Sequence, residues 1–364
     1  MIVRPLTEYC TLNMGQSPDS KTYNTQGKGL PFYQGNADFG ETHPITRVWC
    51  STPVKVAEEG DILISVRAPI GAMNMAVERC CIGRGLAALT PIRNKCSKQF
   101  LYYALQSKVD SLIAQGTGST FKAISKKVLE ATRIPAYSTI EQEQIAETIG
   151  HVDNTIAARR KQLALLDQLV KSRFIELFGD PVRNSMGLPT EPMTTVCAII
   201  DGDRGKNYPK QDDFSDTGYC LFLNAKNVTA TGFSFENRMF ITKEKDNALH
   251  NGKLERGDVV LTTRGTLGNL AFYDDSVPFE NVRINSGMVI LRMNKSVMTE
   301  VFFMEQFKLQ LQSIKGKIAS GSAQPQLPIS TMNKIRILLA PMALQEQFAA
   351  FVEQTDKSKL CGKM

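Results

Sequence analysis

The stretch from residue 142 to residue 178 constrains the fold most, because its apolar residues recur at alternating spacings of four and three. That spacing is typical of a heptad seam rather than of the broader stripe on an ordinary surface helix. The seam positions hold Ile145, Ile149, Val152, Ile156, Leu163, Leu166, Val170 and Leu177, interrupted by Arg159 and Arg173. At 1.5 Å per residue such a helix is about 50 Å long, so we expect a strut rather than the cover of one small core.

Sequence signals mark both ends of this helix. Ser138 and Thr139, with Glu141 and Gln142 three residues later, each fit a capping box, in which each side chain satisfies the backbone of the other residue. Gly179 fits a C-terminal cap, and Pro181 behind it cannot continue a helix. We therefore predict one uninterrupted helix between these signals.

A heptad seam needs a second helix to cover it, and a repeat near the C-terminus supplies one. The sequence Gln-Glu-Gln at 142–144 returns at 345–347, and Val352 stands 203 residues after Ile149, the same offset. A constant offset indicates an internal duplication.

The duplication extends to the segments that precede the two helices. A Gly-Asp pair opens the strongest predicted strand at 62–66, which leads to Arg67. The same pair opens a strand at 259–262, which leads to Arg264, 197 residues after Arg67. A polar loop rich in glycine and serine follows later in both segments. The order of strands, turns and loops is the same in both segments, but the loop residues differ. This indicates two related modules that share a scaffold and contact different parts of a partner.

Composition describes an ordinary globular protein and narrows the function classes. The chain has 364 residues, 42% hydrophobic and 22% charged, which is enough for two or three domains. No run of eighteen apolar residues and no secretory signal stand out, so we expect a cytoplasmic protein without a membrane span. The eight cysteines show no CxxC pair, so we expect reduced, buried thiols and no zinc site. A net charge of +7 is a mild hint of a polyanionic partner.

The ordered double set of motifs resembles the specificity subunit of type I restriction-modification systems. Each module holds a Gly-Asp strand, an arginine, a turn that ends in glycine (Ala-Pro-Ile-Gly at 68–71, Gly-Thr-Leu-Gly at 265–268), a Gly-Ser-rich loop and a Gln-Glu-Gln helix. Three further segments are similar to sequences common in that family: 15–18 (Gly-Gln-Ser-Pro), 34–37 (Gln-Gly-Asn-Ala) and 177–181 (Leu-Phe-Gly-Asp-Pro).

This resemblance implies a non-catalytic subunit that binds double-stranded DNA. Each recognition domain would read one half of a split target, and the helical pair would fix the gap between the halves. The implied partners are two methyltransferase subunits, which carry S-adenosylmethionine, and optionally motor-nuclease (restriction) subunits, which use ATP. The resemblance implies no cofactor or metal in this chain.

The resemblance also implies an α+β fold of two duplicated target-recognition domains separated by a long coiled-coil helix pair. We expect the first domain at 1–137, the first long helix at 138–180, the second domain at 181–340 and the second helix at 341–364. The second helix departs from the family pattern because it is shorter than the first. That departure puts the second methyltransferase contact in question.

Sequence reading requires side chains with paired donors and acceptors, such as arginine for guanine and asparagine or glutamine for adenine. Each candidate alone fits a solvated turn residue equally well. Arg67 and Arg264 are the strongest, although an arginine that both scaffolds share fits a phosphate contact better than a base contact. The candidates are Gln16, Lys21, Gln34, Asn36, Arg67, Arg84, Ser119, Lys122, Arg204, Lys206, Asn224, Lys226, Asn227, Arg264, Arg283, Asn285, Ser322, Gln324 and Gln326.

Two other functions stay open on the sequence alone. A metal-dependent nuclease could use the acidic residues at 201–203 or 212–213, although aspartates in such segments commonly cap turns. The short last helix also fits a truncated orphan subunit or an antirestriction-type interaction protein. No phosphate-binding G-x-x-x-x-G-K-[ST] loop occurs, so we expect no ATP hydrolysis by this chain.

Overall fold

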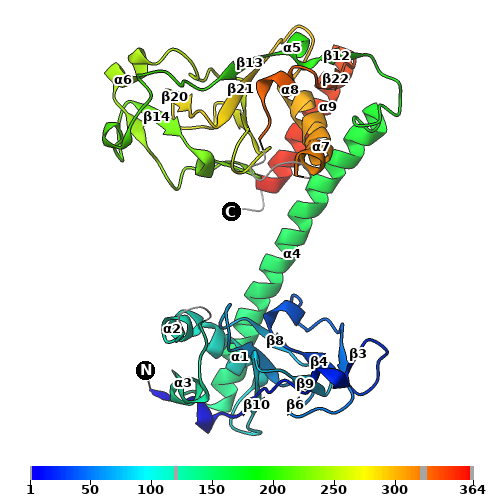
Figure 1. Cartoon of the computed structure of the whole chain (residues 1–364), viewed down its shortest axis with the longest axis vertical. Helices are drawn as coiled ribbons and strands as arrows, with labels where there is room; N and C mark the ends of the chain where they lie inside the picture. Colours follow the sequence, from blue (N-terminus) through cyan, green and yellow to red (C-terminus); the bar gives the residue numbers. More distant parts are fainter. Residues whose placement is uncertain (1, 119–121, 320–325, 361–364) are drawn as a thin grey trace. The chain divides into compact units, whose positions relative to one another are not determined.

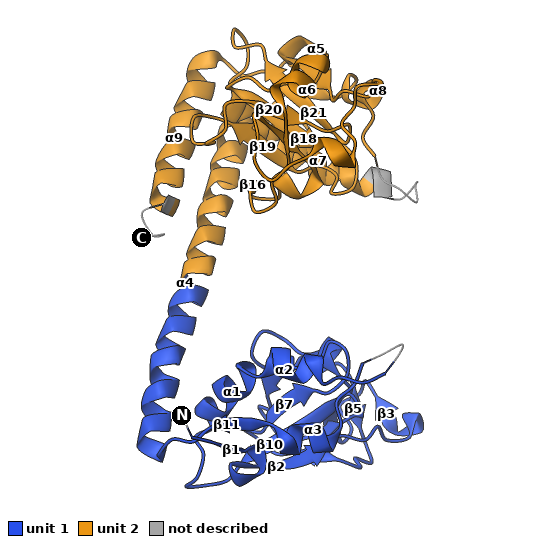
Figure 2. Cartoon of the chain, turned by 90° about the vertical axis from the view of Figure 1, so that its left-hand side faces the viewer, with its two compact units in different colours: residues 1–158 blue, residues 159–364 orange. Residues whose placement is uncertain are grey.

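The computed structural model describes residues 2–118, 122–319 and 326–360, and the chain forms two compact units, residues 1–158 and 159–364 (Figure 2). Each unit contains a mixed domain of helices and sheets. One long helix, α4 (Thr139–Phe178), runs along the sequence from the first unit into the second (Figure 1). The predicted α+β architecture, with a long helix between two duplicated domains, is confirmed.

The first unit is built on a four-stranded antiparallel sheet in the order β2-β10-β7-β8. A second sheet, β3-β5-β4-β9-β6, contains a parallel pair, β4 with β9, and a short ribbon joins β1 to β11. The strands are β1 Val3–Pro5, β2 Cys10–Met14, β3 Tyr23–Asn24, β4 Leu30–Tyr33, β5 Trp49–Cys50, β6 Val56–Ala57, β7 Ile62–Ser65, β8 Met73–Met75, β9 Cys80–Ile82, β10 Leu86–Pro91 and β11 Arg133–Pro135. The helices before α4 are α1 Lys98–Gln106, α2 Val109–Ala114 and α3 Lys126–Ala131.

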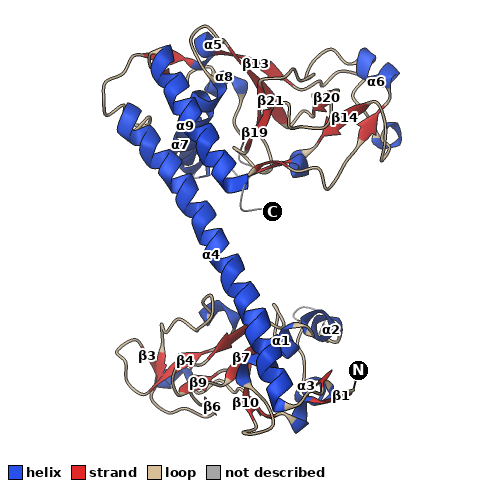
Figure 3. Cartoon of the chain, turned by 180° about the vertical axis from the view of Figure 1, so that it is seen from behind, coloured by secondary structure: helices blue, strands red, loops and turns tan. Residues whose placement is uncertain are grey.

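The second unit repeats this plan. Its four-stranded sheet has the order β13-β21-β18-β19, a parallel pair joins β14 to β20, and a ribbon joins β12 to β22. These strands are β12 Thr190–Pro192, β13 Cys197–Asp201, β14 Cys220–Leu223, β15 Val228–Thr229, β16 Gly232–Phe233, β17 Phe240–Ile241, β18 Asp258–Thr262, β19 Leu270–Tyr273, β20 Val282–Ile284, β21 Met288–Met293 and β22 Arg336–Leu338. The helices are α5 Met193–Val196, α6 Lys243–Ala248, α7 Glu300–Ala319, α8 Ile329–Met332 and α9 Met342–Leu360 (Figure 3).

The two four-stranded sheets are buried on both faces, which explains why their strands read as continuous apolar runs. In β7, Ile62 and Ile64 pack into the core beneath α1, whereas Leu63 between them packs into a second core on the opposite face. In β18, Val259 and Leu261 likewise pack into one core, and Val260 between them packs into another core on the opposite face. The internal duplication therefore includes the core as well as the strand order.

At the start of α4 the predicted pair of Ser138 and Glu141 forms the capping box, whereas the Gln142 side chain bonds to Lys95, Ser97 and Tyr137 instead. The Ser138 hydroxyl accepts from the Glu141 amide at 3.3 Å, and the Glu141 carboxylate accepts from the Ser138 amide at 2.8 Å, so the capping box is present. The helix ends at Gly179, whose φ of +75° favours glycine and whose amide donates to the Ile175 carbonyl.

In the second unit, the seam of α4 packs against α9, and two aromatic side chains outside the predicted heptad positions make the main contact. Phe174 and Phe178 are fully buried, and their rings lie 5.5 and 5.6 Å from that of Phe348 on α9. A straight α-helix rotates by about 20° per heptad relative to a strict 3.5-residue repeat. After several heptads, this rotation turns Phe174 and Phe178 toward α9. Val152 and Ile156, earlier on the seam, are 54% and 44% exposed.

Polar contacts extend the pairing of α4 with α9 toward the C-terminal end of α9. The Arg159 guanidinium donates to the carbonyl oxygen of Lys359 at 2.6 Å, and the Lys359 ammonium pairs with Asp167 at 2.7 Å. Arg159, which interrupts the apolar seam, thus serves as a polar contact to the second helix.

Phe174→Ala should lower the free energy of unfolding by about 3–5 kcal/mol, because it empties a fully buried aromatic site. Urea denaturation followed by circular dichroism measures the change. Ile175→Ala is the matched control, since Ile175 is 41% exposed and should change the midpoint little. Equal effects of the two substitutions would contradict this account of the helix pair.

Candidate nucleic-acid interface

In the first unit, four segments far apart in sequence meet at the Gly83–Gly85 turn that follows β9. The Gln16 amide donates to the Ile82 carbonyl, the Gly85 amide to the Gln34 carbonyl, and the Val66 amide to the Gly85 carbonyl, at 2.9 to 3.1 Å. The approach is so close that a Cβ on Gly85 would lie 2.5 Å from the Gln34 carbonyl oxygen. Only glycine fits there.

A fifth segment joins the same site through the backbone that follows β7. The Ala68 amide donates to the Lys122 carbonyl at 3.0 Å, and the Ile124 amide donates to the Val66 carbonyl at 2.9 Å. Five predicted contact residues are therefore brought together with exposed side chains. We call them the first loop cluster: Gln16, Gln34, Arg67, Arg84 and Lys122.

The second unit builds its counterpart around the segment that follows β20. The Thr263 amide donates to the Gly287 carbonyl at 2.9 Å, as Val66 does to Gly85 in the first unit. The Leu327 amide donates to the Thr263 carbonyl at 3.1 Å, which repeats the bond of Ile124 to Val66. The second loop cluster consists of Arg204, Arg264, Asn285 and Gln326.

A cavity of about 240 Å³ opens within the second loop cluster, lined in part by Arg204, Arg264 and Gln326. The Arg204 guanidinium pairs with the Asp201 carboxylate at 3.0 Å and donates to the Ser286 carbonyl at 3.3 Å. This cavity therefore presents two guanidinium groups, one carboxylate and one amide to a ligand.

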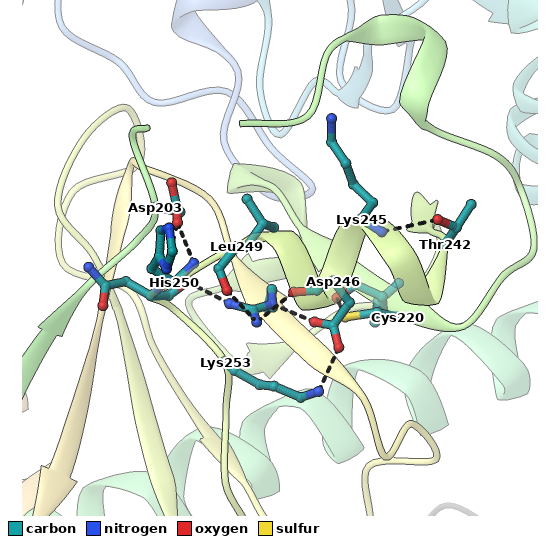
Figure 4. Close-up of polar contacts among 11 residues, drawn as sticks. Asp203, Cys220, Thr242, Lys245, Asp246, Leu249, His250 and Lys253 are labelled. Atoms are coloured by element: carbon teal, nitrogen blue, oxygen red, sulfur yellow. Dashed lines mark hydrogen bonds and ion pairs between the residues drawn. The ribbon is translucent and has the colours of Figure 1, made fainter. Parts of the chain in front are cut away.

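Buried Asp203 holds the loop that carries Arg204. Its carboxylate accepts from the Gly205 amide at 2.8 Å and from the His250 amide at 2.7 Å, and Figure 4 shows the contact with His250. Burial alone would raise the pKa of Asp203, but these backbone hydrogen bonds outweigh burial and hold the pKa below its ordinary value. The carboxylate of Asp203 therefore stabilises a turn through backbone hydrogen bonds, which is the second of the two roles considered for the acidic segment at 201–203.

The prediction that Arg283 contacts DNA is corrected by its position in the interior. Its side chain is 6% exposed and pairs with the fully buried carboxylate of Asp246, which also pairs with Lys253 at 2.6 Å (Figure 4). The remaining guanidinium donors bond to the carbonyls of Leu249 and Asn251 at 3.2 and 2.7 Å. Burial would raise the pKa of Asp246, but the bonds from Lys253 and Arg283 hold it below its ordinary value.

Asn227 is likewise an internal residue rather than a surface reader. It is fully buried, and its amide group donates to the carbonyls of Ser234 and Asn237 at 3.0 and 2.6 Å. Its carbonyl oxygen accepts from the Asn224 amide, and the Asn224 side chain in turn accepts from the Lys226 amide. Both asparagines cap the short 3-10 helix Ala225–Asn227, which leaves Lys226 as the exposed side chain of the three.

The remaining predicted residues have separate positions. Lys21 and Lys206 are exposed, and Asn36 is half-buried at the start of the 3-10 helix Asn36–Asp38. Within the second loop cluster, Asn285 is also half-buried, and its side chain accepts from the Gly287 amide at 2.9 Å. Ser119, Ser322 and Gln324 lie outside the described residues.

Within the ranges that the structure covers, three other features bear on function. No group of three or more His, Cys, Asp or Glu side chains gathers there as a metal site. None of the helices in those ranges is long and apolar enough to cross a membrane. The seven cysteines in the same ranges are free and buried, as predicted.

Two copies of one domain, each presenting amide and guanidinium side chains from converging loops, define a duplicated binding protein. The family model for the type I restriction modification DNA specificity domain matches residues 1–168 and 194–360. The chain therefore belongs to that family, whose members are specificity subunits without catalytic activity of their own.

Individual relatives agree with this assignment. The putative type I restriction enzyme MjaX specificity subunit of Methanocaldococcus jannaschii is 40% identical over 164 residues, which are 45% of this chain and 39% of that protein. The MjaIX specificity subunit of the same organism is 22% identical over 376 residues, covering 93% of this chain and 83% of the relative. The S subunit of a type I restriction-modification system from M. genitalium shares the fold with a TM-score of 0.61, at 17% identity, over 100% of this chain and 91% of that one.

Asp246→Asn should lower the free energy of unfolding at pH 7 by about 3–5 kcal/mol, because it leaves a buried guanidinium without its counter-charge. The folded-state pKa of Asp246 is depressed, so its contribution is present above the ordinary carboxyl pKa and is lost as pH falls through the folded value. The difference between wild type and variant should therefore shrink on acidification below about pH 4. Asp275→Asn, at a fully exposed carboxylate, is the control. A difference that stays constant with pH would contradict this assignment.

Proposed function

We propose that this chain is the subunit that recognises DNA sequence in a type I restriction-modification complex, with each loop cluster reading one half of a split target. One observation carries the proposal. In both units an exposed arginine, Arg67 or Arg264, follows the equivalent strand by two residues and lies against the equivalent loop segment. The scaffold is duplicated, whereas the neighbouring side chains differ.

The chemistry of the clusters suits contact with a duplex. Glutamine can make paired hydrogen bonds to adenine, and arginine can make them to guanine or to phosphate. By the strand registers, Gln16 and Gln34 of the first unit match Asp203 and Asn224 of the second, so neither glutamine is repeated. We assign base reading to residues of this variable kind, and phosphate contact to Arg67 and Arg264.

The rest of the function follows from the proposed assembly. The relatives are named as specificity subunits of restriction enzymes, so the catalytic steps belong to partner subunits. We assign S-adenosylmethionine to methyltransferase partners and ATP to motor-nuclease partners, with this chain holding no cofactor, in the cytoplasm. Residues 1–137 and 181–340 are the proposed readers, 138–180 the spacer helix, and 341–364 the second helix.

Arg67→Ala and Arg264→Ala should each weaken DNA binding by about 5- to 30-fold, and by a similar factor for all sequences, because they remove phosphate contacts. Affinity is measured for matched and mismatched duplexes over a range of salt concentrations, where the slope of log affinity against log salt should fall by about 1. Arg79→Ala is the control, since Arg79 is exposed but pairs with Glu58 at 3.2 Å. Unchanged affinity at moderate salt would remove Arg67 and Arg264 from the interface.

Exchanging residues 1–137 for the corresponding domain of another family member should change one half of the recognised target and leave the other half intact. Each cluster is held by backbone bonds within its own unit, so neither should depend on the side chains of the other. Sequencing of methylated DNA from cells that carry the hybrid and its partner subunits gives the result. A change in both halves would contradict independent reading.

A further inference from the structure

The first glutamine of the Gln-Glu-Gln repeat is a buried clamp in the first unit. Gln142 is fully buried near the start of α4, and all the hydrogen bonds of its amide group are made to backbone. Its nitrogen donates to the carbonyls of Lys95 and Tyr137, each at 3.0 Å, and its oxygen accepts from the Ser97 amide at 2.9 Å. One side chain thus joins the helix to the segment after β10 and to the segment after β11.

The second unit contains the same clamp at Gln345, which is also fully buried. Its nitrogen donates to the carbonyls of Val297 and Ala340 at 3.0 and 2.8 Å, and its oxygen accepts from the Thr299 amide at 2.9 Å. The bonded segments follow β21 and β22, the counterparts of β10 and β11.

The third residue of each repeat is also a glutamine, but it is exposed. The buried position of the first glutamine is therefore not explained by a general preference for glutamine in helices. Gln144 and Gln347 lie two positions further along the same helices, and both are exposed. A buried amide costs stability unless its bonds are made, and a leucine would fill the same space without that requirement. Three directed bonds to two segments resist rotation and sliding of the helix, whereas apolar contacts resist them less.

We infer that Gln142 and Gln345 are positioning residues for target spacing: they fix each helix to the sheet that carries its loop cluster. This inference rests on the proposed function. The segments that they bind continue directly from β10 and β21, and these strands follow the turns at the centre of the two loop clusters. Each added base pair rotates the next half-target by about 34–36°, so looser anchoring of a helix should appear as tolerance of the wrong gap.

The experiment compares Gln142→Met and Gln345→Met with Gln144→Met and Gln347→Met in the full chain. Each protein selects from a duplex library in which both half-targets and the gap between them are randomised. The two buried-site variants should keep the base preferences of both halves. Their discrimination between the wild-type gap and a gap one base pair longer or shorter should fall by about tenfold. The two exposed-site variants should match the wild type.

Hydrogen exchange of the Ser97 amide provides a readout of the clamp itself, and it should be faster in Gln142→Met than in Gln144→Met. If Gln142→Met fails to fold, Ser97→Pro tests the same bond, because Ser97 has a φ of −72° that proline can adopt and proline has no backbone N–H to donate to Gln142. The same broadening of the accepted gap is expected from it.

A folded Gln142→Met or Ser97→Pro protein that selects the gap as sharply as the wild type would overturn the inference. So would a loss of base preference in one half with the gap unchanged. A wild-type chain that selects no split target would instead overturn the proposed function, so the two failures are distinguishable.

Discussion

Backbone hydrogen bonds at the centre of each loop cluster hold the predicted interface together. The bond from Val66 to Gly85 and its counterpart from Thr263 to Gly287 use main-chain atoms only. The exposed side chains of the clusters, such as Gln16 and Gln34, take no part in these bonds and can change without loss of the fold. The proposed reading of DNA by these clusters needs this separation, because a side chain that also held the fold could not change without destabilising it.

The two units fill one equivalent buried position with different side chains, and this difference explains why Arg283 was wrongly predicted to contact DNA. The strand pairings place Cys81 opposite Phe32 in the first unit and Arg283 opposite Phe222 in the second, so the two residues are equivalent. Burial raises the pKa of Cys81 to about 11, which keeps a small neutral side chain there. The second unit fills the position with a buried ion pair instead. An arginine that is part of the interior looks the same in sequence as one that contacts DNA.

Features with a local signal were predictable from the sequence, and features that depend on distant partners were not. The capping box at Ser138, the stop at Gly179 and the repeated strand before Arg67 and Arg264 depend on residues close in sequence, and the structure contains all of them. The burial of Arg283 depends on Asp246, 37 residues away, which no spacing rule identifies. The aromatic contacts of Phe174 were missed because a strict heptad count ignores the drift of a real helix.

The two parts of α4 are attached to their own units by different kinds of interaction. The part in the second unit is held by aromatic packing, in which Phe174 and Phe178 contact Phe302 and Phe348. The part in the first unit has a smaller apolar contact, with Ala146 buried and Ile145 half-buried, and it adds the three bonds of Gln142. Apolar burial supplies most of the free energy of such contacts but little direction, whereas hydrogen bonds inside a protein supply direction. A short contact that must hold a long helix at a fixed angle therefore gains more from a buried glutamine than from another leucine.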